Sequence, residues 1–353
     1  MAVARSDAPV VLLCGYYGED NLGDDALLQV LLQQLPSGFR PLITAHDRDA
    51  VMRLAPEAAV VNRRSLRAVL ASVGQVNAVV LGGGSLLQDS TSFRSLVYYL
   101  ILIVVSRLRG RPVILWGQGL GPLRRRFSRF LVRLVLPLCT AASWRDQRSW
   151  HLAQRLAPAL PMQTAPDPVW QMPRRSWSGG GGIVLSWRPT PLLDKQGWRG
   201  LLDVLEQLAV EQDLQIRWLA FHQHQDATLL ADLHSQGLVS DQLLQRSSTV
   251  VPRGVEAVVD AVRDARLVLP MRLHALILAR LVCCPMAALS YDPKVEAAAE
   301  ASGVVWSSLQ KPPNPQALLS QWRSALDRPA DPVLIDSICE QAALHRKVFQ
   351  NIL

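Results

Sequence analysis

Residues 267–279 read Leu-Val-Leu-Pro-Met-Arg-Leu-His-Ala-Leu-Ile-Leu-Ala, and this stretch predicts a strand that passes directly into a helix. The apolar run Leu267–Leu269 is typical of a buried strand, Pro270 ends it, and a helical pattern of Ala and Leu follows. Arg272 and His274 lie at the junction, where α/β proteins bind ligands. Arginine there can form a forked pair with a carboxylate or phosphate, and histidine can move a proton near neutral pH. The alternative to a ligand site, for such a motif taken alone, is that Arg272 lies on the surface and His274 fills a polar gap in the core.

Short apolar runs alternate with longer helical patterns along the whole chain, and this alternation is typical of parallel α/β units. Helices are predicted between several of these runs, for example over 25–35 and 96–109. The sequence therefore predicts an α/β fold with two Rossmann-like domains facing a cleft. The expected strands are Val10–Cys14, Pro41–Thr44, Ala58–Val61, Ala78–Leu81, Val113–Trp116, Cys139–Ser143, Ile183–Trp187, Gln215–Ala220, Thr249–Val251, Leu267–Leu269, Met286–Ser290 and Val304–Trp306.

The composition changes just after Met172, where residues 173–182 read Pro-Arg-Arg-Ser-Trp-Ser-Gly-Gly-Gly-Gly. A stretch with no periodicity and four consecutive glycines is typical of a flexible linker. We therefore expect an N-terminal Rossmann-like domain over 1–172, a linker over 173–182 and a C-terminal Rossmann-like domain over 183–330. Residues 331–353 are expected to form a last helix that packs back on the N-terminal domain.

The composition is that of a folded protein, since 49% of the 353 residues are hydrophobic and 19% are charged. The net charge of +8 favours anionic small ligands, a phosphate-bearing substrate or an acidic membrane surface. Nucleic acid is not expected as a partner, because no recognition-helix, RNP or zinc-finger pattern is present and only 6% of residues are aromatic. The five cysteines have no metal-ligand spacing, so we expect buried, reduced thiols in a cytoplasmic protein and no metal site.

Neither a secretory leader nor a membrane-spanning helix is expected. Met1–Asp7 has no apolar core of its own. The longest apolar run, Leu96–Val105, is about half the roughly 20 residues that a spanning helix needs, and it predicts a buried helix. Arg124–Arg133 mixes arginines with large apolar side chains at helical spacing. A solvated helix face is the ordinary interpretation, and peripheral contact with anionic lipid at the inner face of the membrane is the alternative.

Two glycine-rich turns follow predicted strands in the first half of the chain. Residues 15–25 read Gly-Tyr-Tyr-Gly-Glu-Asp-Asn-Leu-Gly-Asp-Asp, with glycine spacing that differs from the dinucleotide-binding fingerprint. Residues 81–90 read Leu-Gly-Gly-Gly-Ser-Leu-Leu-Gln-Asp-Ser, and their amides can hold phosphate or sugar hydroxyls. A purely structural turn is the alternative for both. The candidates for holding a sugar acceptor are Gly15, Asn21, Asp24, Gly83, Gly84, Gln88 and Asp89.

Four further strand ends carry glycine or polar side chains. Arg145 follows a predicted strand, and pairing with Asp146 is its structural alternative. Arg188 follows the first predicted strand of the second half, which makes it a second cationic candidate. At the strand end Ser290–Lys294, an Asp-Pro turn is the alternative to ligand contact. The four stretches are Trp116–Pro122, Ser143–Ser149, Ser186–Pro189 and Ser290–Lys294.

Five of these motifs together resemble the polysaccharide pyruvyl transferase family, and most closely its CsaB-like branch. The resemblance runs in order from about residue 10 to residue 300. It implies a glycosyltransferase-B-like pair of domains. It also implies transfer of the pyruvyl group of phosphoenolpyruvate to a sugar of a cell-wall or exopolysaccharide unit, which forms a pyruvate ketal and releases phosphate. The motifs are Gly15–Asp24, Gly82–Asp89, Ser143–Ser149, Met271–His274 and Tyr291–Val295.

The resemblance also implies roles for individual residues. The family's Arg-Leu-His motif falls on Arg272, Leu273 and His274, with Arg272 binding the donor and His274 as the best candidate for the acid that protonates it. The resemblance places the second donor-binding arginine at Arg145, with Arg188 as the competing candidate. No cofactor is needed for this chemistry. The expected partners are phosphoenolpyruvate and a sugar acceptor, while lipid linkage of the acceptor, the base and the oligomeric state stay open.

Two other functions compete with this one. A glycosyltransferase that uses a nucleotide sugar in the same architecture would bind a uridine nucleotide and hold its ribose with an acidic residue such as Glu256 or Asp260. A non-catalytic protein that binds anionic glycans or membranes through arginines would lose affinity with added salt and would not depend on His274.

Overall fold

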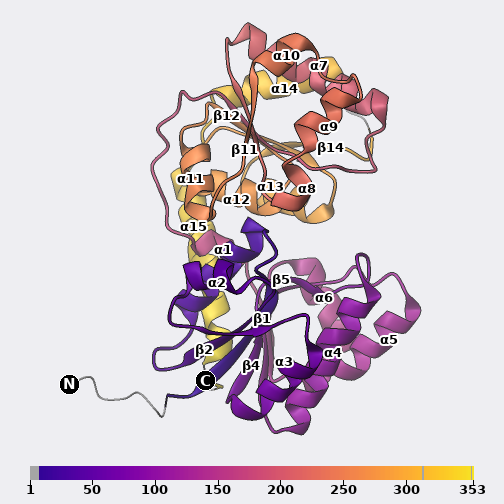
Figure 1. Cartoon of the computed structure of the whole chain (residues 1–353), viewed down its shortest axis with the longest axis vertical. Coiled ribbons are helices and arrows are strands. Elements are labelled where there is room, and N and C mark those ends of the chain that lie inside the picture. The colour runs from indigo at the N-terminus through magenta and orange to yellow at the C-terminus, as the bar shows by residue number, and fades with distance from the viewer. Residues whose placement is uncertain (1–7, 312–313, 351) are drawn as a thin grey trace, which may run out of the picture. The chain divides into compact units, whose positions relative to one another are not determined.

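The chain folds into two compact units, which Figure 1 shows as a ribbon of the computed structural model. The structure describes residues 8–311, 314–350 and 352–353. The stretch Met1–Asp7, in which no leader is expected, lies outside the described residues. The first unit comprises Met1–Asp20, Asp24–Gln171 and Cys339–Leu353, and the second comprises Asn21–Gly23 and Met172–Ile338.

The first unit contains a parallel sheet in the order β3-β2-β1-β4-β6-β7-β8, with β5 paired to the far end of β6. Every residue of β4 and β6 is buried, as expected for parallel strands covered on both faces. The elements are β1 (Val10–Tyr17), α1 (Leu22–Gln34), β2 (Arg40–Ala45), α2 (Arg48–Leu54), β3 (Ala59–Asn62), α3 (Leu66–Ser72), η1 (Val73–Gln75), β4 (Ala78–Leu81), β5 (Gly84–Leu87), α4 (Phe93–Leu108), β6 (Val113–Leu120), α5 (Arg126–Val135), η2 (Leu136–Leu138), β7 (Ala141–Trp144), α6 (Gln147–Leu156), β8 (Met162–Thr164) and η3 (Pro168–Gln171).

The second unit contains a parallel sheet in the order β11-β10-β9-β12, and a parallel bridge from Val268 to Met286 connects it to the pair β13-β14. Trp187 packs edge-on against Trp218 in its core, with ring centroids 5.5 Å apart. The elements are β9 (Ile183–Ser186), α7 (Lys195–Glu211), β10 (Ile216–Leu219), α8 (Gln223–Asp226), α9 (Leu229–Ser235), α10 (Asp241–Gln245), β11 (Ser247–Val250), α11 (Val255–Arg263), β12 (Leu267–Pro270), α12 (Leu273–Leu281), β13 (Ala287–Ser290), α13 (Pro293–Ala301), β14 (Val305–Ser308) and α14 (Pro315–Leu326).

Both units have the doubly wound strand order of nucleotide-binding folds. In each, the first strand lies inside the sheet, two strands follow on one side, and the chain then crosses to the other side. The strand order reverses between β1 and β4 in the first unit and between β9 and β12 in the second. Open α/β sheets bind ligands at this switch point, beyond the carboxyl ends of the strands. The turns after these four strands are therefore the places to look for a site.

The predicted α/β class and the two Rossmann-like units are confirmed, and each of the twelve predicted strands is present near its expected place. Two strands were not predicted. β5 arises inside the second glycine turn, where Gly84 pairs with Gln118 and Leu87 with Leu120. Glycine is depleted in strands, so its sequence indicated a loop. β8 is a short, half-buried edge strand without an apolar alternation.

The glycine segment 173–182 belongs to the second unit and is bonded to it. The N–H of Gly181 donates to the carbonyl of Asp264 at 2.6 Å. A Cβ at Gly182 would lie only 2.4 Å from the carbonyl oxygen of Gln215. The structure therefore differs from the flexible linker expected here, because these glycines allow close backbone packing instead of mobility.

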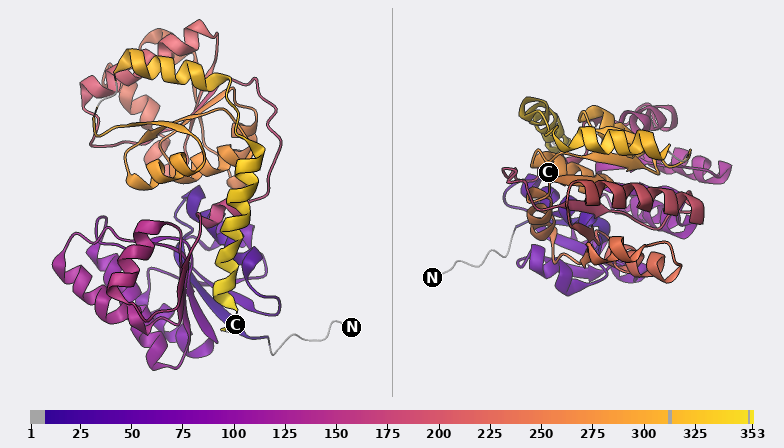
Figure 2. Two further views of the ribbon diagram at one scale, coloured as in Figure 1. Left: turned by 180° about the vertical axis from the view of Figure 1, so that it is seen from behind. Right: turned by 90° about the horizontal axis from the view of Figure 1, so that it is seen from above.

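The C-terminal residues after α15 (Pro332–Ala342) pack on the first unit as the short 3-10 helix η4 (Ala343–Phe349), and Figure 2 shows this end of the chain in yellow. The side chain of Gln163 donates to the carbonyl of Leu344 at 2.6 Å. His345 Nε2 lies 2.7 Å from the carbonyl oxygen of Pro166. His345 is fully buried, and burial lowers its pKa to about 4. A neutral imidazole thus helps to hold the C-terminus in place.

The apolar run that predicted a buried helix is part of α4, where Leu96, Leu102 and Ile103 have no exposed surface. None of the helices in the described ranges has the length and apolar character needed to cross a bilayer. The buried thiols of Cys14 and Cys139 have pKa values raised to about 12 by burial, so they pack as small apolar groups.

Candidate active site

Arg188 and Arg272 follow the two strands that flank the switch point of the second unit. β9 and β12 pair in parallel, with Ser186 opposite Pro270. Each arginine comes two positions after its paired residue. Neighbouring strands are about 4.8 Å apart, so the two side chains start from adjacent backbone positions. The structure therefore places the backbones of these two candidate donor-binding arginines at the ends of adjacent strands.

The guanidinium of Arg272 is held by Asp226, the last residue of α8. Nε donates to Oδ2 at 3.2 Å, and Nη2 donates to Oδ1 and, at 3.1 Å, to the side-chain oxygen of Gln225. The side chains of Asp226 and Arg272 are only 1% and 11% exposed. The third nitrogen, Nη1, has no hydrogen-bond partner among the residues that the structure describes. A guanidinium nitrogen of this kind can donate to an anionic group.

Asp226 also orders the turn that follows β10. Its Oδ2 accepts a hydrogen bond from the backbone N–H of His222 at 2.8 Å. His222 is buried, and its pKa is lowered by that burial and then by the charge of Arg272. Sequence analysis missed both residues. The available signal was the polar run His222–Asp226 just past a predicted strand, which is the same pattern that identified Arg272.

Arg188 packs on Tyr291, the first residue after β13. Its guanidinium carbon lies 4.9 Å from the centre of the ring, and Nη1 donates to the tyrosine hydroxyl at 3.2 Å. This cation–π contact orients the guanidinium. In the same turn Asp292 accepts from the N–H of Lys294 at 3.0 Å and caps α13. Asp292 thus forms the structural Asp-Pro turn, and Tyr291 provides the contact with Arg188.

Leu273 and His274 are the first two residues of α12, and Arg272 directly precedes the helix without capping it through its side chain. The first amides of a helix carry partial positive charge and favour anions. Leu273 is buried and His274 is half-buried. The leucine therefore anchors the helix start in the core, whereas the imidazole is not sealed in apolar surroundings.

In the first unit the turns after β1 and β4 meet. A Cβ at Gly84 would lie 3.5 Å from Oδ1 of Asp24, and the φ of +88° at Gly84 favours glycine. A Cβ at Gly82 would lie 2.2 Å from the hydroxyl of Tyr17. Gln118, buried in β6, donates from Nε2 to the carbonyl of Gly82 at 2.7 Å. The second glycine turn is thus tightly packed on the residues around it, with Asp24 beside it.

Three other candidates of these turns have local structural roles. A Cβ at Gly15 would lie 2.3 Å from the ring of Tyr17, and a Cβ at Gly83 would lie 2.5 Å from the side chain of Leu27. Asn21 Oδ1 accepts from the N–H two residues later at 3.2 Å. Their identities follow from packing and turn formation, so none of them requires a ligand to explain it.

Arg145 lies in the first unit and forms a buried ion pair. Nη1 donates to Oδ2 of Asp167 at 3.1 Å, and these two side chains are 5% and 6% exposed. Nη2 donates to the hydroxyl of Ser85 at 2.9 Å. A Cβ at Gly119 would lie 3.1 Å from Nε of Arg145. The structure thus brings together three motifs of the first unit, and their arginine already has a carboxylate partner.

Gln88 and Asp89 are used by their own loop. Gln88 Oε1 accepts from the N–H of Ser90 at 2.7 Å. Asp89 accepts from the N–H groups of Arg124 and Arg125 at 2.7 and 2.9 Å. Burial opposes ionisation of Asp89, but these hydrogen bonds outweigh it and hold its pKa below the ordinary value. Both carboxylate oxygens therefore fix the segment that leads into α5.

Asp25 has an unusual acidity. Burial, and after it the charge of the neighbouring Asp20, raise the pKa of its carboxyl to about 7 against the opposing effect of Arg53. A carboxyl that titrates near neutral pH beside a candidate site suits general acid–base chemistry.

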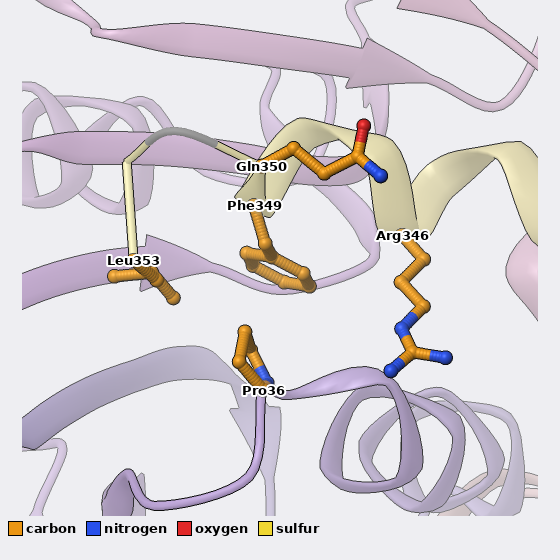
Figure 3. A pocket seen from close by; sticks show the side chains of 5 residues that line it. All are labelled: Pro36, Arg346, Phe349, Gln350 and Leu353. Atoms are coloured by element: carbon orange, nitrogen blue, oxygen red, sulfur yellow. The ribbon is translucent and has the colours of Figure 1, made fainter.

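A surface hollow of about 370 Å³ lies elsewhere in the first unit, as Figure 3 shows. None of the predicted site residues lines it. Among the described residues, no group of three or more His, Cys, Asp or Glu side chains is placed to hold a metal ion. The hollow is lined by Pro36, Arg346, Phe349, Gln350 and Leu353.

Solved structures with the same fold define the class of this protein. The complex of S. aureus MnaA with UDP has a TM-score of 0.63 at 12% identity, and the match covers 98% of both chains. A putative UDP-N-acetylglucosamine 2-epimerase from Listeria monocytogenes has a TM-score of 0.60 at 11% identity, over 96% of this chain and 94% of that one. Anabaena Alr3699/HepE, in complex with UDP and glucose, has a TM-score of 0.60 at 12% identity, over 96% and 95%. These likenesses show a glycosyltransferase-B-type fold.

The family is defined by sequence. The model of the polysaccharide pyruvyl transferase family matches residues 21–293, which is most of the chain. No curated protein matches it. The protein thus belongs to the polysaccharide pyruvyl transferase family, as the motifs indicated.

Proposed function

We propose that the protein transfers the pyruvyl group of phosphoenolpyruvate to two hydroxyls of a sugar in a cell-wall or exopolysaccharide unit, with release of phosphate. Family membership supports the reaction class. The observation that carries the proposal is the pair Arg188 and Arg272, which leave adjacent strands at the switch point of the second unit. Phosphoenolpyruvate has a carboxylate and a phosphate, and forked guanidinium groups suit both.

The second unit holds the donor in this proposal. Nη1 of Arg272 and the first amides of α12 bind one anionic group of phosphoenolpyruvate, and Arg188 binds the other. Arg188 is the better second arginine because Tyr291 orients it within the same unit. The guanidinium of Arg145 is in the first unit and is already neutralised by Asp167.

His274 delivers the proton that starts the reaction. The proton goes to the methylene carbon of the donor, which becomes a methyl group, and the adjacent carbon becomes oxocarbenium-like. One sugar hydroxyl bonds to that carbon, the bond to phosphate breaks, and a second hydroxyl closes the ketal. Of the two hydroxyl protons, one restores His274 and the other leaves on phosphate. A well-placed proton donor contributes roughly a hundred- to ten-thousand-fold in rate.

The first unit holds the sugar acceptor in this proposal. Asp24 and the amides of the turn at Gly83 and Gly84 face the hydroxyls, since this turn follows the switch-point strand β4. Asp25 is the preferred base. It accepts the hydroxyl proton that then leaves on phosphate, because its pKa of about 7 allows it to take up and release a proton at neutral pH.

Ligand-induced stabilisation tests this function directly. We expect phosphoenolpyruvate to raise the melting temperature more than equal concentrations of inorganic phosphate or UDP, because a ligand stabilises only the state that binds it. Turnover with a panel of sugars in D₂O should release phosphate and place one deuterium in the new methyl group. A larger shift with UDP and no phosphate release would contradict the proposal and favour a nucleotide-sugar glycosyltransferase.

A further inference from the structure

Helix α5 exposes a stripe of large apolar side chains to solvent. Phe127, Phe130 and Leu134 are 58%, 55% and 56% exposed, and Leu138 in the next turn is 38% exposed. Their spacing of three, four and four residues places them along one line of the helix. The opposite side, with Val132, is buried in the core of the first unit. The helix therefore has one apolar side for folding and a second that folding leaves uncovered.

A row of arginines runs beside this stripe. Arg126, Arg129 and Arg133 each directly precede one of its first three apolar residues, and all three are exposed. In the described residues none of them forms an ion pair with a carboxylate, although Arg129 donates to the carbonyl of Leu123 at 2.8 Å. We define these three arginines with Phe127, Phe130, Leu134 and Leu138 as the α5 surface.

The sequence segment that contains the α5 surface has no acidic residue, and the carboxylate of Asp89 is bound by the backbone N–H groups of Arg124 and Arg125 at the start of α5. Residues 90–145 include ten arginines and no Asp or Glu. α4, which packs against α5, lies in this stretch, and Figures 1 and 2 show the two helices side by side. Phe93 of α4 contacts Phe127 with ring centroids 6.3 Å apart, and Arg125 lies over Phe93 at 5.2 Å. The aromatic and cationic groups thus continue onto the neighbouring helix.

We propose that the α5 surface binds the surface of an anionic lipid bilayer, with α5 parallel to the membrane. Phenylalanine and leucine side chains would enter the boundary between headgroups and acyl chains, while the arginines would contact lipid phosphates. A second copy of the chain is a poor occupant, because a symmetric contact would bring the same unpaired arginines together. This proposal does not depend on the reaction proposed above.

Binding to vesicles tests the proposal with the full-length chain. We expect co-sedimentation with vesicles of phosphatidylcholine and phosphatidylglycerol and little with phosphatidylcholine alone. The triple variant Arg126→Gln, Arg129→Gln, Arg133→Gln should bind anionic vesicles about a hundredfold more weakly, since each arginine near such a surface contributes about fivefold. A variant with Phe127→Ser, Phe130→Ser and Leu134→Ser should lose the binding that remains at high salt, because only apolar insertion resists screening.

A charge-matched control separates this surface from net charge. The exposed residues Arg67, Arg199 and Arg328, each changed to Gln, remove the same charge elsewhere and should leave vesicle binding within about twofold, as distant charges are screened. If this control lost as much vesicle binding as the triple variant in α5, the assignment of binding to the α5 surface would be overturned. Unchanged high-salt binding of the serine variant would overturn insertion, and binding of an acidic protein or RNA without any binding of vesicles would overturn the lipid partner. Unchanged melting temperatures would show that each variant is folded.

Discussion

Asp226 and Arg272 form a nearly buried pair in which one carboxylate accepts from both Nε and Nη2 of one guanidinium. The arginine follows β12 and the aspartate ends α8, so the second unit itself fixes the direction of the guanidinium. A cation that is oriented before its ligand arrives loses less entropy on binding. We therefore expect Asp226 to act as a positioning residue for Arg272.

The change Asp226→Asn should weaken donor binding. Asparagine keeps the shape but removes the charge, so Arg272 loses its fixed direction and is left as an uncompensated, mostly buried cation. We expect KM for phosphoenolpyruvate to rise about tenfold or more and stability to fall by about 3 kcal/mol. Steady-state kinetics and denaturant unfolding measure the two effects. Asp213→Asn, at the exposed pair with Arg246, is the control, and an unchanged KM in the Asp226 variant would exclude the positioning role.

Arg188 and Arg145 should respond differently to the same substitution. Arg188→Gln removes a proposed donor contact, so KM for phosphoenolpyruvate should rise by about tenfold or more, as expected for a lost charged contact. Arg145→Gln leaves Asp167 buried without its cation and should lower stability by about 3 kcal/mol. Steady-state kinetics and melting temperatures of both variants show which of the two arginines contacts the donor. A larger KM effect in the Arg145 variant would reverse the assignment.

Replacing His274 by Ala should affect the chemical step. The imidazole is the proposed proton donor, so kcat should fall at least about a hundredfold while the thermal shift by phosphoenolpyruvate persists. Arg272→Ala should instead remove most of that thermal shift. The exposed His234→Ala is the matched control and should retain full activity. Full phosphate release by the His274 variant would rule out the acid role.

Stability should decline in mild acid because of His345. Burial lowers the pKa of its ring to about 4, whereas an unfolded histidine has a pKa of about 6.5. Between these values the unfolded chain binds more protons than the folded one, so the free energy of unfolding falls as pH drops from about 6.5 to about 4. The full loss would be about 3 kcal/mol.

The variant His345→Gln isolates this effect. Glutamine can still donate to the carbonyl of Pro166 but does not titrate, so part of the pH dependence between about pH 4 and 6.5 should disappear. Urea unfolding at several pH values measures it. The exposed His234→Gln should keep the full dependence, and equal curves for the natural chain and His345→Gln would contradict the assignment.

Much of the candidate site was predictable from sequence because strand ends are local features. Leu267–Leu269 is recognisable as a buried strand without any partner, and Arg272 and His274 follow it directly in the chain. The same reasoning found Arg188 after β9. Apolar periodicity and the residues that stop it depend on only a few neighbours, so the alternation of elements could be inferred from sequence alone.

Other features of the candidate site depend on which strands are neighbours in the sheet. No local sequence pattern gives the order of the strands. The sheet order places β9 beside β12, so that Arg188 and Arg272 follow adjacent strands, and it leaves Arg145 with Asp167 in the other unit. Asp226 reaches Arg272 from 46 positions away in the chain. Pairing across such separations is determined by tertiary packing.

For the glycine run and for α5, the sequence indicated the local pattern, but tertiary packing decided its role. Four glycines indicated mobility, yet Gly182 is glycine because the carbonyl of Gln215 passes within reach of any Cβ. The sequence of α5 identified an amphipathic helix, but its apolar residues outnumber those that the core can cover. Only the packed first unit decides that Val132 is inside and that Phe127 and Phe130 face water. Burial is a property of the assembled chain, whereas amphipathic spacing is already present in the sequence.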